Sequence, residues 1–229
     1  MHKYLFVYNS NKVCLGLLMS TVIAILNQKG GSGKTTIATN VAHALMLKNN
    51  TVLLVDSDPQ GSARDWNEAS KGEILPVIGL DKETLPKDLK AVSVGYDYII
   101  IDGAPQIAKL AAAAVKTADL ILMPVQPSPY DIWATSDLVD IIKARQQVMR
   151  GKPKAAFLIN RTIKNTKLSG EVAEALSSYE IPILKNVTTQ RVAYPMTASE
   201  GKTVLSETTS NPAALEIMAI VEEIEGLLK

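Results

Sequence analysis

One glycine-rich segment has the residue types and the spacing of a phosphate-binding loop. Residues 27–36 read N-Q-K-G-G-S-G-K-T-T. Gly30, Gly31 and Gly33 allow the backbone to turn tightly and to direct its N–H groups at an anion. A helix is expected to begin directly after the loop, so its positive end would face the same anion. Lys34 would reach the β- and γ-phosphates of a nucleotide, and the Thr35 hydroxyl would ligate Mg²⁺.

This loop departs from two general patterns. The pattern G-x-x-x-x-G-K-[ST] requires glycine where this chain has Gln28, and a second lysine, Lys29, follows directly. The dinucleotide pattern G-x-G-x-x-G also fails, because no third glycine follows Gly33. Taken alone, Lys29 would be interpreted as a solvated loop lysine.

The loop stands within an alternation of short apolar runs and longer helical segments. This alternation is typical of an α/β domain with a mostly parallel, twisted sheet covered by helices on both faces. The runs are continuously apolar, as expected for strands buried on both sides. Strands are predicted at 21–27, 51–56, 97–102, 119–125 and 154–160, and helices at 34–48, 107–116 and 132–149. A last helix is predicted after an Asn211 cap, with Pro212 at its first position.

Composition restricts the class of protein further. The chain has 229 residues, and its 24 Lys and Arg against 23 Asp and Glu give a formal net charge of +1. Any nucleic-acid contact must therefore come from a local basic patch. The lone Cys14 excludes an intrachain disulfide, and His2 and His43 form no zinc-like cluster, which favours a cytoplasmic protein.

The N-terminal part contains an apolar run that is too short for a membrane span. Residues 13–26 are mostly apolar but are interrupted by Ser20 and Thr21. Because Met19 directly precedes the first predicted strand, residues 1–18 are interpreted as an extension with a possible non-native start. Residues 19–229 are interpreted as one domain.

Four motifs in order resemble one family. K-G-G-S-G-K-T-T resembles the deviant Walker A motif of the ParA/MinD class of P-loop ATPases. L-L-V-D-S-D-P-Q-G (53–61) is similar to the D-x-D-P-Q segment of the ParA branch, and Y-I-I-I-D (98–102) to its Walker B strand. P-V-Q-P-S-P-Y-D (124–131) resembles the proline-rich segment of the small, ParF-like partition ATPases. The resemblance runs from about Thr21 to the C-terminus and implies a single-domain P-loop ATPase.

The resemblance implies roles for particular residues. Lys34 and Thr35 would serve ATP and Mg²⁺, and Lys29 would reach the partner's phosphates across an ATP-sandwich dimer. Asp56 would join the Mg²⁺ shell, Asp58 would position the attacking water, and Asp102 would hold Mg²⁺ through water. The implied catalytic residues are Lys29, Lys34 and Asp58, and the implied nucleotide-binding residues are Lys29, Gly30, Gly31, Ser32, Gly33, Lys34, Thr35, Thr36 and Asn160.

Several polar and aromatic residues have a plainer interpretation. Asn160 matches an asparagine that reads the adenine edge in this class, but a turn asparagine is nearly as good an interpretation. Asp119 and Asp131 are expected to be helix caps. Trp66, Trp133 and Tyr130 are expected to be packing or interface residues.

The family implies ATP-driven partition of a plasmid or chromosome. The expected partners are a second copy of the chain, a small centromere-binding adaptor and non-specific nucleoid DNA. The C-terminus reads V-E-E-I-E-G-L-L-K, an acidic helix end that anionic lipid would repel, so no stable membrane association is expected. The DNA candidates are Arg191, Arg150, Lys152 and Lys154, with Lys143, Arg145, Arg161, Lys164 and Lys167 as further basic residues.

Two other functions stay open from the sequence. The first is a related ATPase that positions a protein complex at a pole or membrane rather than DNA. The second, a metabolic P-loop enzyme, is weakened because no second substrate pocket can be read from the sequence.

Overall fold

A computed structural model describes residues 6–9, 12–15, 20–163 and 168–229. Its centre is a six-stranded sheet in the order β5-β4-β6-β3-β7-β8. Every neighbouring pair in this sheet is parallel, which confirms the predicted sheet type. The strands are β3 (Thr21–Ile25), β4 (Val52–Asp56), β5 (Val77–Gly79), β6 (Tyr98–Asp102), β7 (Leu120–Val125) and β8 (Lys154–Ile159).

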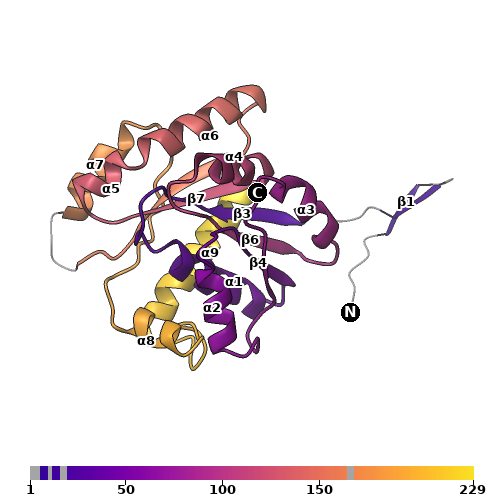
Figure 1. The fold of residues 1–229 in the computed structure, drawn as a ribbon, viewed down its shortest axis with the longest axis horizontal. Helices are drawn as coiled ribbons and strands as arrows, with labels where there is room; N and C mark the ends of the chain where they lie inside the picture. The colour runs from indigo at the N-terminus through magenta and orange to yellow at the C-terminus, as the bar shows by residue number, and fades with distance from the viewer. Residues whose placement is uncertain (1–5, 10–11, 16–19, 164–167) are drawn as a thin grey trace.

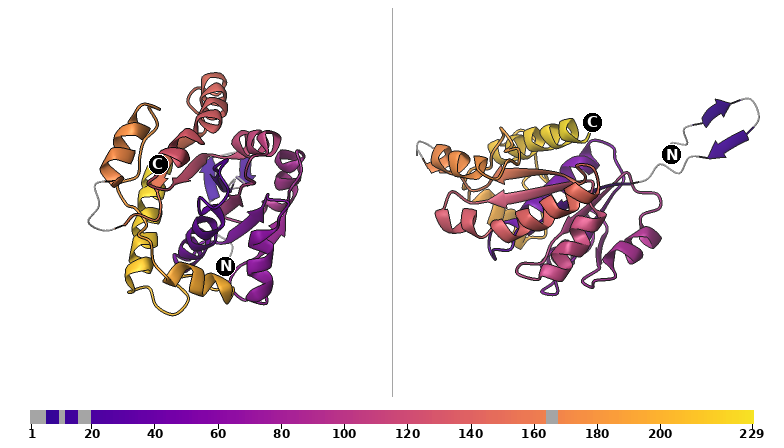
Figure 2. Two further views of the ribbon diagram at one scale, coloured as in Figure 1. Left: turned by 60° about the vertical axis from the view of Figure 1, so that its left-hand side comes forward. Right: turned by 90° about the horizontal axis from the view of Figure 1, so that it is seen from above.

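Helices cover both faces of the sheet (Figures 1 and 2). One face is packed by α1 (Lys34–Leu47), α2 (Ser62–Ala69) and α9 (Pro212–Leu228). The other face is packed by α3 (Leu85–Val92), α4 (Ala108–Thr117), α5 (Pro129–Trp133), α6 (Ser136–Val148) and α7 (Leu168–Ser177). The short helix α8 (Ala193–Ser199) lies beside α2 and has no buried residue.

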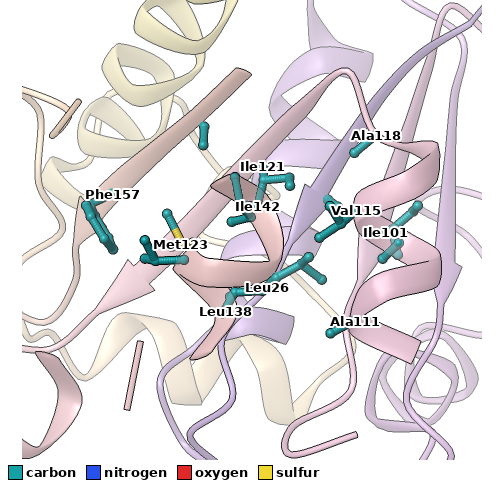
Figure 3. Close-up of a cluster of buried hydrophobic side chains, with 14 of the residues drawn as sticks. Leu26, Ile101, Ala111, Val115, Ala118, Ile121, Met123, Leu138, Ile142 and Phe157 are labelled. Atoms are coloured by element: carbon teal, nitrogen blue, oxygen red, sulfur yellow. The ribbon is translucent and has the colours of Figure 1, made fainter. Parts of the chain in front are cut away.

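The two faces explain the unbroken apolar runs. In β3, Val22 and Ala24 face one cluster of buried side chains, whereas Ile23 and Ile25 face the other. Figure 3 shows part of the first cluster, in which Leu26, Ile121 and Met123 lie against side chains of α4 and α6. Alternate side chains of one strand are therefore buried in opposite layers.

All five predicted strands are present, each within a residue or two of its expected bounds. The predicted final helix is also confirmed. The Asn211 side chain accepts a hydrogen bond from the Ala214 N–H at 2.9 Å, and Pro212 takes the first position of α9.

One predicted helix was wrong in its continuity. The segment expected as a single helix over 132–149 is divided into α5 and α6. Between them Thr135 is fully buried, and its hydroxyl donates to the Ile132 carbonyl at 2.6 Å. This local bond competes with the helical pattern and ends α5.

The N-terminal segment forms a separate element. Strands β1 (Phe6–Asn9) and β2 (Lys12–Leu15) pair as an antiparallel hairpin outside the six-stranded sheet. Figures 1 and 2 show this hairpin standing away from the α/β domain. The interpretation of residues 1–18 as an extension stays a prediction.

Candidate functional site

The predicted functional residues meet at the carboxyl ends of three central strands. In the sheet register, Ile25 at the end of β3 pairs with Asp102 at the end of β6, and Asp102 pairs with Asp56 at the end of β4. The loop that follows β3 leads into α1. Adjacent parallel strands thus bring residues far apart in sequence to one edge, where α/β sheets bind ligands.

At two positions the loop backbone has a conformation that favours glycine. Gly31 has a φ of 76° and Gly33 a φ of 95°, both in the left-handed region. Gly33 precedes the first residue of α1, and a Cβ on it would lie 2.3 Å from Asn160 Nδ2. Glycine at 33 is therefore required by both the backbone and the neighbouring side chain. A Cβ on Gly30 would meet nothing within 4 Å.

The loop surrounds a buried hydroxyl that bonds to none of the residues described by the structure. Ser32 is fully buried, and its Oγ makes no hydrogen bond with the residues that the structure describes. A buried polar atom without a partner is rare in folded proteins, and this one lies in the middle of the glycine loop. The observation fits a loop built to receive an external acceptor such as a phosphate oxygen.

Lys34, the first residue of α1, places its ammonium group inside the loop. Its Nζ donates to the Lys29 carbonyl at 3.0 Å, and the residue is only 7% exposed. Burial lowers the pKa of Lys34, and the negative charges of Asp102 and Asp58 oppose that shift. The lysine is held at the start of a helix, where an anion would also face the helix dipole.

Thr35 and Asp102 form the predicted metal-binding pair. Thr35 Oγ1 donates to Asp102 Oδ2 at 2.7 Å. Burial raises the pKa of Asp102 to about 7, the Thr35 hydrogen bond lowers it, and the charge of Asp56 raises it further. Asp102 Oδ1 is buried and lacks a partner among the described residues. A hydroxyl and a buried carboxylate oxygen fit Mg²⁺, which binds few protein ligands and completes its shell with water and phosphate oxygens.

Asp56 is hydrogen-bonded through both of its carboxylate oxygens. Its Oδ2 accepts from the backbone N–H groups of Ala63 at 3.1 Å and Arg64 at 3.0 Å. The Arg64 guanidinium adds an ion pair to the same oxygen, and Oδ1 accepts from Asp58 N at 3.0 Å. Oδ2 is thus used at the start of α2 and Oδ1 in the turn before it, so the carboxylate fixes α2 to the end of β4. The place of Asp56 in the Mg²⁺ shell stays a prediction.

Asp58 lies on the turn between Asp56 and α2. It is half-buried, and its Oδ1 accepts from Gln60 N at 3.0 Å. The Asp58 carbonyl accepts from Gly61 N at 2.9 Å and from the Arg64 guanidinium at 2.9 Å. Sequence reasoning missed Arg64, which holds both ends of this turn and also pairs with Asp81 at 3.2 Å.

Lys29 pairs within its own chain. Its Nζ bonds to Asp131 Oδ2, on α5. Asp131 is 1% exposed, and its other oxygen has no partner among the described residues. The expectation that Asp131 is merely a helix cap was therefore wrong. Asp119 is not a helix cap either, since its Oδ2 accepts from Val22 N at 2.9 Å.

The proline-rich segment 124–131 forms one wall of the loop. Asn27 Nδ2 donates to the Pro124 carbonyl at 2.8 Å, and Gln126 Nε2 donates to the Gly31 carbonyl at 2.7 Å. The contact between Lys29 and Asp131 is a third connection. Residues about a hundred positions apart therefore determine the shape of the loop together.

Asn160 supports the loop from the far side. Its Nδ2 donates to the Ser32 carbonyl at 2.7 Å, and its Oδ1 accepts from the Thr188 hydroxyl. Asn160 is 4% exposed, so its amide is committed to contacts within the chain. The adenine contact stays a prediction and would require the amide to exchange these partners.

A cavity of about 320 Å³ adjoins Thr35. It lies between α1, α2 and α8, and its lining includes Thr35, Thr36, Asp65 and Trp66. Trp66 is 6% exposed and donates from Nε1 to the Lys202 carbonyl at 3.0 Å, which confirms it as a packing residue. Trp133 and Tyr130, in contrast, are exposed and touch each other edge to face.

The basic DNA candidates differ in exposure and in their ion-pair partners. Arg191 is half-buried and forms an ion pair with Glu216 at 2.6 Å. Lys154 begins β8, at the sheet edge opposite the glycine loop, and its Nζ bonds to the Leu227 carbonyl. Arg150 and Lys152 are exposed in the turn just before β8, whereas Lys143 pairs with Glu180 at 3.2 Å. Half-buried Arg145 and exposed Arg161 lie before and after β8, and Lys164 and Lys167 lie outside the described residues.

Fold and loop together define a P-loop nucleotide-binding protein: a parallel sheet, a glycine loop at a helix N-terminus, and a Lys34–Thr35–Asp102 constellation. The chain belongs to the CobQ/CobB/MinD/ParA nucleotide-binding domain family, whose sequence profile matches residues 23–204.

Individual relatives match along nearly their whole length. The chain is 30% identical over 207 residues to maintenance of carboxysome distribution protein A of Halothiobacillus neapolitanus, covering 88% of this chain and 95% of that protein. It is 26% identical over 234 residues to the chromosome-partitioning ATPase Soj of Thermus thermophilus, covering 88% and 94%. The solved Mg-ADP complex of the septum site-determining protein MinD from Pyrococcus horikoshii has a TM-score of 0.71 at 18% identity, covering 91% and 97%.

Proposed function

We propose that this chain is an Mg²⁺-dependent ATPase that dimerises around ATP and uses the hydrolysis cycle to position a large cargo. The observation that carries the proposal is the contact between Thr35 and Asp102 at 2.7 Å beside the buried Lys34. When bound, Mg²⁺ would offset the negative charge of the phosphates.

Each residue at the loop has a role in this proposal. The N–H groups of the glycine loop and Lys34 would hold the phosphates, and Thr35 with Asp102 would hold the cation. Asp58 would position the attacking water from the turn that Arg64 fixes. Lys29 of a second copy would stabilise charge on the transferring group, which makes hydrolysis depend on dimerisation.

The nucleotide part is tested by substituting the loop lysine. Lys34→Ala should abolish ATP binding, because it removes the buried ammonium group from the loop. Nucleotide affinity is measured by calorimetry, and Mg²⁺-dependent phosphate release is measured in parallel. Lys87→Ala is a suitable control, since Lys87 lies on α3 at the other face of the sheet. Normal ATP affinity of Lys34→Ala would contradict the proposed role.

A protein assembly is the cargo that the relatives favour over DNA. The Halothiobacillus protein is named for the distribution of carboxysomes, which are protein assemblies. Ion pairs with Glu216 and Glu180 also partly offset the positive charges of Arg191 and Lys143, two of the DNA candidates. DNA partition is therefore the second candidate function rather than the first.

DNA partition remains a candidate because of the second relative and the short-partition motifs. Soj of Thermus thermophilus is named a chromosome-partitioning ATPase. Exposed Arg150 and Lys152 could still contact DNA phosphates non-specifically. ATP-dependent retention on DNA across a salt series, compared with ADP and with no nucleotide, tests that contact.

Deletion of the gene distinguishes the two cargos. Clustering of a protein assembly with normal replicon inheritance would support the first candidate. Replicon loss with no change in protein assemblies would support partition instead.

No membrane role is proposed. Within the part of the chain that the structure describes, no helix is long and apolar enough to cross a bilayer. On α9, Ile217, Ile220 and Ile224 are fully buried against the sheet, whereas Leu215 is exposed.

A further inference from the structure

Asp131 is a buried carboxylate whose one partner at the glycine loop is Lys29. The side chain of Asp131 is 2% exposed, whereas that of Lys29 is 37% exposed. Asp131 Oδ1 has no hydrogen-bond partner among the residues that the structure describes. The carboxylate thus faces the loop from inside the protein, and the ammonium group approaches it from the solvent side.

The surrounding chain fixes the carboxylate at this place. Asp131 belongs to α5, and its backbone N–H donates to the Ser128 carbonyl at 3.0 Å. Asn27 accepts from Lys29 N at 2.8 Å and donates to the Pro124 carbonyl at 2.8 Å. The backbone of Lys29 and the segment that carries Asp131 are therefore connected through one asparagine. These backbone contacts leave the Lys29 ammonium group with Asp131 as its partner among the described residues.

The pair is asymmetric in what it costs to break. A charge buried without a partner is unfavourable, whereas an exposed ammonium group regains its hydration. Removal of Lys29 would therefore cost more free energy than removal of Asp131, because it leaves the Asp131 carboxylate buried without a partner. The Lys29–Asp131 ion pair is therefore favoured in the isolated chain.

We propose that Asp131 is a positioning residue that retains Lys29 within its own chain until a second copy of the chain and ATP compete for the lysine. This inference rests on the proposed function, in which Lys29 acts across the dimer. Lys29 cannot bond to Asp131 and also reach phosphates bound by a partner. The ion pair therefore opposes dimerisation, and it sets the protein concentration at which the ATPase becomes active.

The pair itself is tested without nucleotide. Melting temperatures of the wild type, Lys29→Gln, Asp131→Asn and the double variant form a cycle. Lys29→Gln should melt below the wild type because Asp131 loses its partner, and adding Asp131→Asn should restore part of the loss. Strictly additive shifts would overturn the proposal, whether or not the protein binds ATP.

The dimer is tested with ATP by analytical ultracentrifugation. Asp131→Asn should lower the protein concentration for half-dimerisation, by roughly threefold to tenfold for an ion pair of this exposure. The rate of hydrolysis per chain should become less dependent on protein concentration. Asp140→Asn, which removes the same charge from an exposed site on α6, should match the wild type.

A conservative variant separates positioning from packing. Asp131→Glu keeps the charge and should return the half-dimerisation concentration toward the wild-type value. An unchanged or higher concentration for Asp131→Asn would overturn the proposal. Absence of any ATP-dependent dimer, in every variant, would instead refute the proposed function and the inference with it, while the melting cycle would still report the ion pair.

Discussion

The stability of the nucleotide-free chain should fall as pH rises through the range in which Asp102 ionises. Asp102 is 1% exposed, and burial raises its pKa from 3.8 to about 7. Between these two values the folded chain binds a proton at Asp102 that the unfolded chain has released. The free energy of unfolding must therefore decrease with rising pH across this window.

The size of the effect follows from the shift. A difference of about 3 pKa units corresponds to about 4 kcal/mol between the fully protonated and fully ionised limits. The loss is spread from about pH 4 to pH 7, and about 2 kcal/mol of it falls between pH 5 and pH 7. The bound cation should reverse this trend, because a positive charge beside Asp102 favours its ionised form.

Urea unfolding at several pH values measures this dependence. The matched variant is Asp102→Asn, which can still accept the Thr35 hydrogen bond but cannot ionise. The difference in unfolding free energy between the two proteins isolates Asp102 from every other titrating group. It should grow with pH in favour of the asparagine variant. Parallel pH profiles for the two proteins would show that Asp102 titrates normally and that the reasoning from burial is wrong.

Three further outcomes are expected. Gly33→Ala should destabilise the chain by about 2–4 kcal/mol in urea unfolding, from left-handed strain and the clash with Asn160. Gly30→Ala, whose added Cβ meets nothing within 4 Å, is the control, and equal losses in both variants would contradict the clash. Asn211→Ala should cost about 1 kcal/mol by removing the cap of α9, and an unchanged urea midpoint would refute that role. Asp58→Ala should leave ATP binding and dimerisation intact but block phosphate release. Undiminished turnover would remove Asp58 from the catalytic residues.

Much of the fold could be predicted from local patterns. Continuous apolarity identified the five long strands, and the cap at Asn211 identified the last helix. The edge strand β5 was missed because it has only three residues and none of them is buried. The break at Thr135 was missed because it depends on one buried hydroxyl bond that no periodicity reveals.

The candidate site was predictable in its loop but less so in its surroundings. The spacing of Gly33, Lys34 and Thr35 is local, and the sequence shows it directly. The partner of Lys29 is 102 residues away, and the sheet topology alone brings it close. The signal that could have found Asp131 is its place in the proline-rich segment. Arg64 could have been suspected as a cation just inside a helix that follows Asp56 and Asp58.

The position of β3 in the sheet has a consequence for synthesis of the chain. This strand is the earliest of the six to leave the ribosome, yet its neighbours are β6 and β7, registered at Tyr98 and Leu120. The strand that leads into the glycine loop thus stays without its first partner until β6, 77 residues further on (98 − 21), has been made. Nascent chains released before β6 would expose an apolar strand with two open edges, which is a template for aggregation. A pause in translation before that point should therefore lower the yield of folded protein more than a later one.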